Sequence, residues 1–227
     1  MISFNRYTEI FCFTKKDFFY IVGAPEEEIE KLNQVGEKIN PDRIGSWINV
    51  SEMGGIDGGW CFTFPVDIKV ALPAIEQGNS VDNLLNWCEK HNVTECYYLA
   101  RDMGAEPPRQ TEVKIHIPPT NNLLETVIDA YDMCGFPHPP EGALNALREA
   151  KALNLSINIT EDDFVRISVS IPNPSLEIIK KFAPTDVEKI QNTLGQVSAV
   201  EFQYLKEDYG YNVYHEGHDV HVSYTIN

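Results

Sequence analysis

Strand-like runs that end in the same way recur along the chain. Each is an apolar, polar, apolar triplet followed by proline and then by a helix-like stretch: Phe62-Thr63-Phe64-Pro65, Ile115-His116-Ile117-Pro118 and Val169-Ser170-Ile171-Pro172. A fourth copy, Tyr224-Thr225-Ile226-Asn227, follows with Asn227 in place of the proline. Self-similarity at a fixed period is typical of repeated supersecondary units. We therefore predict a single domain over residues 1–227, with repeats at 15–78, 79–134, 138–184 and 185–227.

Within each predicted repeat the pattern indicates a helix, two strands and a second helix. Apolar residues at helical spacing predict helices over residues 26–39, 71–77, 81–91, 122–133, 141–153, 176–182 and 186–194. Alternating runs predict strands over residues 43–50, 60–64, 95–100, 112–117, 155–160, 165–171 and 199–206, with a final strand or hairpin over 211–226. The turns within repeats are too short for parallel crossovers, so the strands should be antiparallel.

The third repeat indicates which side of the strands meets the helices. Its first strand alternates an apolar row with a polar row: Leu155, Ile157 and Ile159 against Ser156, Asn158 and Thr160. The apolar row should pack on the helices and leave a polar face opposite. We predict an α+β fold in which α-β-β-α units close into an antiparallel barrel of about eight strands around a polar lumen, with helices outside. The alternative is an open sheet whose polar face meets water.

The charge of the chain limits its partners. A formal net charge of −16 argues against binding nucleic acid or an anionic membrane surface. No apolar run is long enough to span a membrane and no signal-peptide layout is present, so we expect a cytoplasmic protein. The 5 cysteines include no C-x-x-C pair, which indicates reduced thiols. The histidines between residues 215 and 221 favour an exposed turn over a metal site.

Several stretches resemble the ABBA-type aromatic prenyltransferases, in their soluble bacterial phenol and naphthalene branch. The resemblance covers residues 15–185 and rests on Val22-Gly23-Ala24-Pro25, Ser46 to Ser51, Trp60 to Phe64, Val81 to Leu85, Pro139-Pro140, Leu155 to Thr160 and Asp163 to Val169. It implies helix-strand-strand-helix units around a polar lumen. That family usually has one repeat more, so the chain resembles a shortened form.

The resemblance implies a transferase of secondary metabolism that moves an allylic isoprenoid, dimethylallyl or geranyl, from its diphosphate to an aromatic acceptor. Such a reaction requires cations for the diphosphate and aromatic faces beside the allylic cation. Alternation directs Lys114 and Arg166 into the lumen, and we assign both to the diphosphate together with Arg43. Further candidates are Lys206 and Arg101. The alternative for Lys114 and Arg166 is an ion pair with Glu112.

The acceptor side of the site is assigned by the same alternation. Trp47 should form an aromatic wall, and His116 is suited to position the acceptor or take its proton. The remaining lumen wall is assigned to Asn49, Thr63, Asn158, Ser168, Tyr204 and His221, with Tyr97 or Tyr98 as further aromatic candidates. The alternative for the aromatic residues is ordinary packing. Some members of the family bind magnesium through an aspartate where this chain has Cys61, so we expect no cofactor; magnesium stays open as an alternative that Cys61 does not support with an acidic ligand.

Three hypotheses follow. The first is the prenyltransferase, with a small-molecule diphosphate and an aromatic acceptor as partners. The second is a non-catalytic relative that binds a hydrophobic or aromatic ligand, or a protein at an unfinished sheet edge. The shortened form and the missing acidic metal ligand favour this second hypothesis. The third is a structural interaction platform. Homo-oligomerisation through edge strands stays open.

Overall fold

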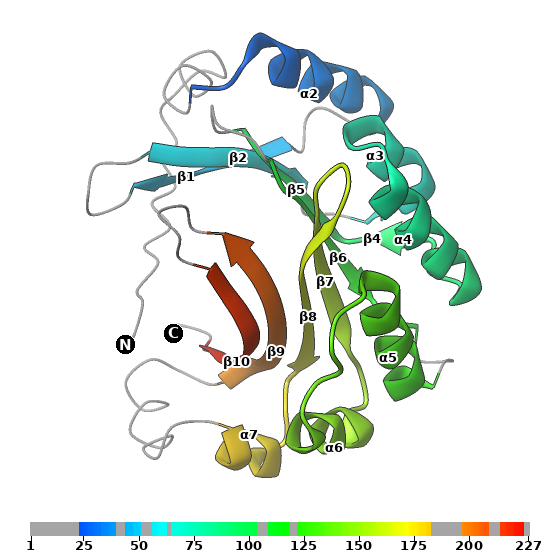
Figure 1. Ribbon diagram of the computed structural model, residues 1–227, viewed down its shortest axis with the longest axis vertical. Helices are drawn as coiled ribbons and strands as arrows, with labels where there is room; N and C mark the ends of the chain where they lie inside the picture. Colours follow the sequence, from blue (N-terminus) through cyan, green and yellow to red (C-terminus); the bar gives the residue numbers. More distant parts are fainter. Residues whose placement is uncertain are drawn as a thin grey trace.

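The computed structural model describes residues 23–39, 44–50, 56–62, 65–103, 109–118, 122–182, 197–208 and 214–224. These residues form an α+β fold (Figure 1). The strands are β1 (Ile44–Val50), β2 (Ile56–Phe62), β3 (Val66–Asp67), β4 (Glu95–Cys96), β5 (Tyr98–Asp102), β6 (Thr111–His116), β7 (Asn154–Ile159), β8 (Phe164–Pro172), β9 (Val197–Asp208) and β10 (Tyr214–Tyr224). The helices are α2 (Glu26–Ile39), α3 (Ile68–Ile75), α4 (Asn79–Lys90), α5 (Leu123–Cys134), α6 (Glu141–Glu149) and α7 (Leu176–Phe182).

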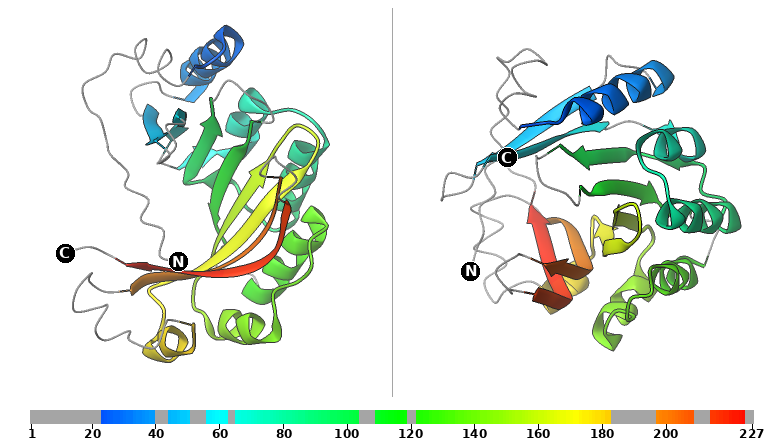
Figure 2. Two further views of the ribbon diagram at one scale, coloured as in Figure 1. Left: turned by 60° about the vertical axis from the view of Figure 1, so that its left-hand side comes forward. Right: turned by 45° about the horizontal axis from the view of Figure 1, so that its top comes forward.

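Most of the strands belong to one antiparallel sheet. Its order is β1-β2-β5-β6-β7-β8-β9-β10, while β3 and β4 form a separate pair. Every neighbouring pair in the large sheet is antiparallel, as predicted. The sheet is a curved layer with α3, α4 and α5 on its convex side (Figures 1 and 2). Among the described residues, no helix combines the length and the apolar character needed to cross a bilayer.

The predicted barrel closure is wrong. Strands β1 and β10 stand at opposite ends of the sheet, and within the described ranges they do not pair with each other. The sheet is therefore open, which is the alternative weighed above. Alternation fixes which face of a strand is apolar, but closure depends on strand tilt and stagger, which a period of two does not encode.

The order of elements is α4-β4-β5-β6-α5 followed by α6-β7-β8-α7, so the strand predicted over residues 95–100 is divided into β4 and β5. Helices α2 and α7 have the predicted bounds. Helix α3 begins at Ile68, earlier than predicted, because Asp67 caps it: Asp67 Oδ1 accepts a hydrogen bond from the backbone N–H of Lys69 at 2.9 Å. The predicted helix over residues 186–194 lies outside the described residues.

The apolar rows of the strands form the core with the helices. Leu155, Ile157 and Ile159 are at most 1% exposed. They join a single apolar cluster with residues of the opposing strand and of the helices, namely Ile167, Val169, Leu84, Val127 and Leu147. The predicted packing of these rows against the helices is confirmed. The polar residues that alternate with them must therefore project from the other side.

The start of α4 is fixed against the turn between β7 and β8. Ser80 Oγ donates hydrogen bonds to the backbone oxygens of Thr160 at 2.7 Å and Glu161 at 3.3 Å. Gly78 has a φ of +123°, and a Cβ there would lie 2.1 Å from the Glu161 carbonyl oxygen. Only glycine fits this approach. The second predicted repeat is thereby joined to the third.

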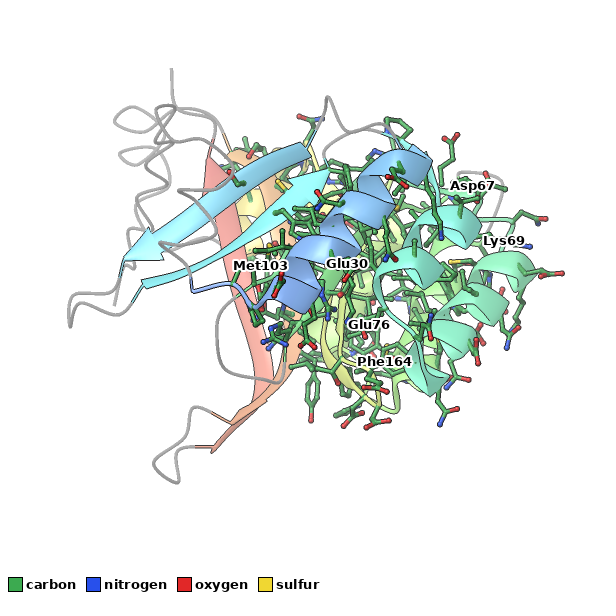
Figure 3. The ribbon with its side chains drawn as sticks, turned by 90° about the horizontal axis from the view of Figure 1, so that it is seen from above. Glu30, Asp67, Lys69, Glu76, Met103 and Phe164 are labelled. Carbon is green, nitrogen blue, oxygen red and sulfur yellow. The ribbon has the colours of Figure 1, made fainter. Side chains whose placement is uncertain are left out.

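A buried ion cluster joins α2 and α3 to the sheet. Arg101 of β5 donates to Glu28 Oε2 from Nε at 2.6 Å and to Glu28 Oε1 from Nη2 at 3.1 Å. Its Nη1 donates to Glu76, which follows α3, and to Thr111 Oγ1 of β6 at 2.9 Å. Figure 3 labels Glu76 in this region and Asp67 and Lys69 at the start of α3.

The charges in this cluster stabilise one another. Burial alone would raise the pKa of Glu28, but the hydrogen bonds and charges of Arg101 and Lys31 outweigh it and hold that pKa below its usual value. Lys31 Nζ lies 3.2 Å from Glu28 Oε1. The side chain of Lys31 is 45% exposed, whereas that of Arg101 is 5% exposed. Arg109 Nη1 also lies 3.8 Å from Glu28 Oε1. Of these three cations, Arg101 is the most buried and Lys31 the most exposed.

We expect Arg101→Met to lower the free energy of unfolding by about 3–5 kcal/mol, because it removes the buried cation that Glu28 and Glu76 share and leaves Glu28 only Lys31 and the more distant Arg109. Urea denaturation at neutral pH measures this. Lys31→Met is the matched control and should lower the free energy of unfolding by less than about 1 kcal/mol.

The folded-state pKa of Glu28 is depressed, so the stabilisation that its ion pairs provide is present above the unfolded value of about 4.3 and is lost at lower pH. The difference between wild type and Arg101→Met should shrink there; equal losses in the two variants at neutral pH would contradict the prediction.

Candidate functional site

Backbone register places many of the predicted lumen residues on the side of the sheet opposite the helices. One row across successive strands consists of Tyr98, Lys114, Ser156, Ser168 and Gln203. The next row consists of Cys61, Ala100, Glu112, Asn158 and Arg166. Directly opposed residues of an antiparallel pair share a face. We call the surface that these two rows form the polar face.

Glu112 lies in the middle of the polar face and binds both cations that were predicted to contact the diphosphate. Its Oε1 accepts hydrogen bonds from Ser156 Oγ at 2.7 Å and Arg166 Nη2 at 3.1 Å, and lies 3.4 Å from Lys114 Nζ. The ion pair weighed as an alternative for these cations is therefore present. The side chains of Lys114, Arg166 and Glu112 are 35%, 27% and 18% exposed, so a ligand can reach all three.

Arg166 is held in place by the amide of Asn158. Its Nε and Nη2 donate to Asn158 Oδ1 at 3.2 and 2.9 Å, and Asn158 Nδ2 donates to Gln110 Oε1 at 3.1 Å. Among the described residues, Nη1 of Arg166 has no hydrogen-bond partner. The guanidinium is thus fixed in orientation while its Nη1 hydrogens remain available to an anion.

Lys114 adjoins an aromatic ring as well as a carboxylate. Its Nζ lies 4.6 Å from the centroid of the Tyr98 ring, within the range of a cation–π interaction. A cation and an aromatic face are therefore adjacent on the polar face, which is the combination that the sequence predicted for the site.

Tyr97 and His116 form an aromatic stack near this pair. Their ring centroids are 3.9 Å apart and their planes differ by 13°. His116 Nδ1 lies 2.6 Å from Asn154 Oδ1. Because an amide oxygen only accepts, Nδ1 is the donor in this contact. Burial, followed by the charges of Glu112 and Glu201, raises the pKa of Tyr97 to about 12, so its phenol stays protonated at neutral pH.

A hollow of about 170 Å³ opens beside the stack. It is lined by Pro65, Asn92, Val93, Thr94, Glu95, Cys96, Tyr97, His116 and Pro118. At about 30 Å³ for each water molecule in the liquid, this volume corresponds to about six waters, which is room for a small aromatic ring. His116 reaches both this hollow and the end of the polar face.

Two candidates lie on the helix side of the sheet instead. Tyr204 is 3% exposed and packs against Phe136 with ring centroids 5.0 Å apart, so its assignment to the lumen wall is wrong. The reason is periodicity, because Tyr204 continues the buried row of Val200 and Phe202. Arg101 belongs to the buried cluster described above and is no diphosphate ligand.

Other assignments are described only in part. Backbone positions alone are described for Trp47 and Asn49 in β1, Lys206 in β9 and His221 in β10. Arg43 and Thr63 lie outside the described residues. Lys114, Arg166, Asn158 and Ser168 share the polar face, and His116 stands at its end opposite Asn154. The functional roles of all these residues stay predictions.

Cys61 stands where the resemblance implies a magnesium-binding aspartate. Burial, reinforced by the charge of Glu112, raises the pKa of its thiol, so the group is neutral at pH 7. Magnesium prefers oxygen ligands, and Glu112 is engaged by its cations. Within the part of the chain that the structure describes, no group of three or more His, Cys, Asp or Glu side chains is arranged to hold a metal. The residues present do not fit such a site.

Sequence reasoning missed the Tyr97–His116 stack. Adjacent residues of a regular strand face opposite sides, so at most one of Tyr97 and Tyr98 was expected in the site. The strand is interrupted between the end of β4 at Cys96 and the start of β5 at Tyr98. As a result, the Tyr97 ring contacts His116 and the Tyr98 ring contacts Lys114, two residues that share one face of β6. Period-two reasoning contains no signal for that interruption.

Sequence comparisons with known proteins find a similar protein. No protein-family model matches the chain. A PH domain-containing protein of Dictyostelium discoideum is 39% identical over 226 aligned residues, which cover 92% of this chain and 49% of that protein. The chain thus spans about half the length of this curated relative. The name of the relative states no catalytic function.

A solved structure has a similar fold. It is 6-dimethylallyltryptophan synthase from Micromonospora olivasterospora in complex with DMASPP and Trp, with a TM-score of 0.55 and 10% identity over 90% of this chain and 69% of that chain. At this identity the likeness concerns the fold alone. The expected resemblance to aromatic prenyltransferases is confirmed at the level of architecture.

We expect Lys114→Met and Arg166→Met each to lower the free energy of unfolding by less than about 1 kcal/mol, because their ion pairs with Glu112 are partly exposed. Thermal and urea unfolding measure this, with Arg101→Met as the buried reference. A loss of unfolding free energy as large as that of Arg101→Met would mean that the cations of the polar face stabilise the fold.

Proposed function

We propose that this chain is a prenyltransferase that binds an allylic diphosphate and an aromatic acceptor on the polar face. The observation that carries the proposal is that Lys114 and Arg166 converge on one oxygen of Glu112, so a single diphosphate can contact both cationic groups. The similar fold of 6-dimethylallyltryptophan synthase, solved with DMASPP and Trp, supports this function.

The residues of the polar face match the demands of the transfer. When the C–O bond to the diphosphate breaks, both electrons leave with the diphosphate, and Lys114 and Arg166 stabilise its growing charge. Tyr98 lies against Lys114 and offers an aromatic face to the allylic cation. A ring carbon of the acceptor then forms the new bond and loses a proton, which Nε2 of His116 accepts.

A second candidate function is binding without transfer. Two observations favour it: Glu112 already takes both cations, and the described sheet is open along β1 and β10. On this alternative the polar face holds an anionic or aromatic ligand that stays unreacted.

Transfer is tested by incubating the protein with dimethylallyl or geranyl diphosphate and a panel of phenols and indoles. Product mass and released diphosphate are measured. Lys114→Met and Arg166→Met should each lower kcat/KM about 100-fold or more, because each removes a charge aimed at the leaving group. Lys90→Met is the control, since Lys90 pairs with Asp129 on the helix side.

The same assay separates the two candidates. Binding of the allylic diphosphate without any product would leave only the binding function. Neither binding nor product would overturn both.

His116→Gln should lower kcat about 100-fold with little change in KM, because it removes a proton acceptor and leaves the diphosphate contacts intact. Steady-state kinetics measure this on whichever acceptor reacts. His138→Gln is the control, as His138 contacts only the exposed Asp132 among the interactions described. Unchanged kcat in His116→Gln would remove His116 from the mechanism.

A further inference from the structure

We propose that Glu112 sets the affinity of the anion site, holding Lys114 and Arg166 at one point and competing with an incoming diphosphate for them. The inference rests on the proposed function, because it concerns the same two cations. Glu112 opposes binding of the diphosphate, whereas Lys114 and Arg166 promote it.

The geometry places the carboxylate where an anion would bind. One oxygen, Oε1, is 2.7 Å from Ser156 Oγ, 3.1 Å from Arg166 Nη2 and 3.4 Å from Lys114 Nζ. This convergence of one hydroxyl and two cationic groups is the coordination that a phosphate oxygen would require. Glu112 therefore acts as an internal anion of the site.

The charge balance gives the sign of the effect. Two cations and one carboxylate leave this cluster with a surplus of one positive charge. A diphosphate can enter by displacing Glu112 from the cations, or by using Nη1 of Arg166 and the remaining hydrogens of Lys114 while Glu112 stays. The first route loses the ion pairs of Glu112, and the second places like charges close together. Both routes weaken anion binding.

The same carboxylate also organises the site. Without a shared acceptor, two cations this close would repel each other, and the long side chain of Lys114 would turn toward water. A glutamine at position 112 keeps a carbonyl oxygen that accepts from Ser156 and Arg166, so it preserves this organisation while removing the charge. It separates competition from positioning.

Calorimetric titration with inorganic diphosphate tests the inference on the full chain. We expect Glu112→Gln to bind diphosphate about tenfold tighter than wild type. Glu112→Ala is a second variant and should also bind more tightly, by a smaller factor because it loses the shared acceptor. Glu201→Gln is the matched control: Glu201 lies opposite Ser170 on the same side of the sheet, and no contact with either cation is described. It should change the dissociation constant by less than about threefold.

The outcomes are distinct from those of the transferase assay. Tighter binding in Glu112→Gln supports the inference even if no acceptor is ever prenylated. Binding equal to or weaker than wild type in both Glu112 variants overturns it, as does an equal gain in Glu201→Gln, and the transferase activity can stand in either case. If neither the wild type nor any variant binds diphosphate, the inference fails.

Discussion

The period-two alternation of the strands divides the sheet into two faces, and the rest of the structure depends on that division. Ile157 and Ile167 lie under the helices with no exposed surface, so their sequence neighbours Asn158 and Arg166 are directed to the other side. A slip of one residue in register would exchange the two faces and bury the cations. The apolar core therefore positions the candidate site without touching it.

Each face carries an ion cluster, and the two clusters differ in burial. On the helix side, the carboxylates of Glu28 and Glu76 bind Arg101, and all three side chains are buried. On the polar face, Lys114 and Arg166 share the single carboxylate of Glu112 and remain accessible. Removing a member of the buried cluster leaves an uncompensated charge, whereas the exposed cluster tolerates change. The chain as a whole has a net charge of −16, whereas the Lys114–Arg166–Glu112 cluster holds two cations and one carboxylate.

The sequence predicted much of the fold because the relevant signals are local. Helical spacing located α2 and α7 with their observed bounds, and alternation put Lys114, Arg166, Asn158 and Ser168 on one face. Whether the sheet closes depends on tilt and stagger summed over all strands, which no single segment encodes. Tyr204 was predicted to line the lumen, but it continues the buried row of Val200 and Phe202.

The sequence predicted the two cations of the candidate site and left open whether Glu112 pairs with them. Alternation can place Lys114 and Arg166 on the same face as Glu112, yet whether all three meet at one oxygen depends on rotamers and on Ser156 and Asn158 across the strands. Binding an anion needs only those contacts. Transfer also needs a space from which water is excluded, because an allylic cation beside water is captured by it. The described sheet supplies the contacts on one curved face, and Tyr98 and the Tyr97–His116 stack lie beside them. On the proposed function, anion binding would depend on the polar face itself, while turnover would depend in addition on what covers that face, so a single assay can distinguish the two.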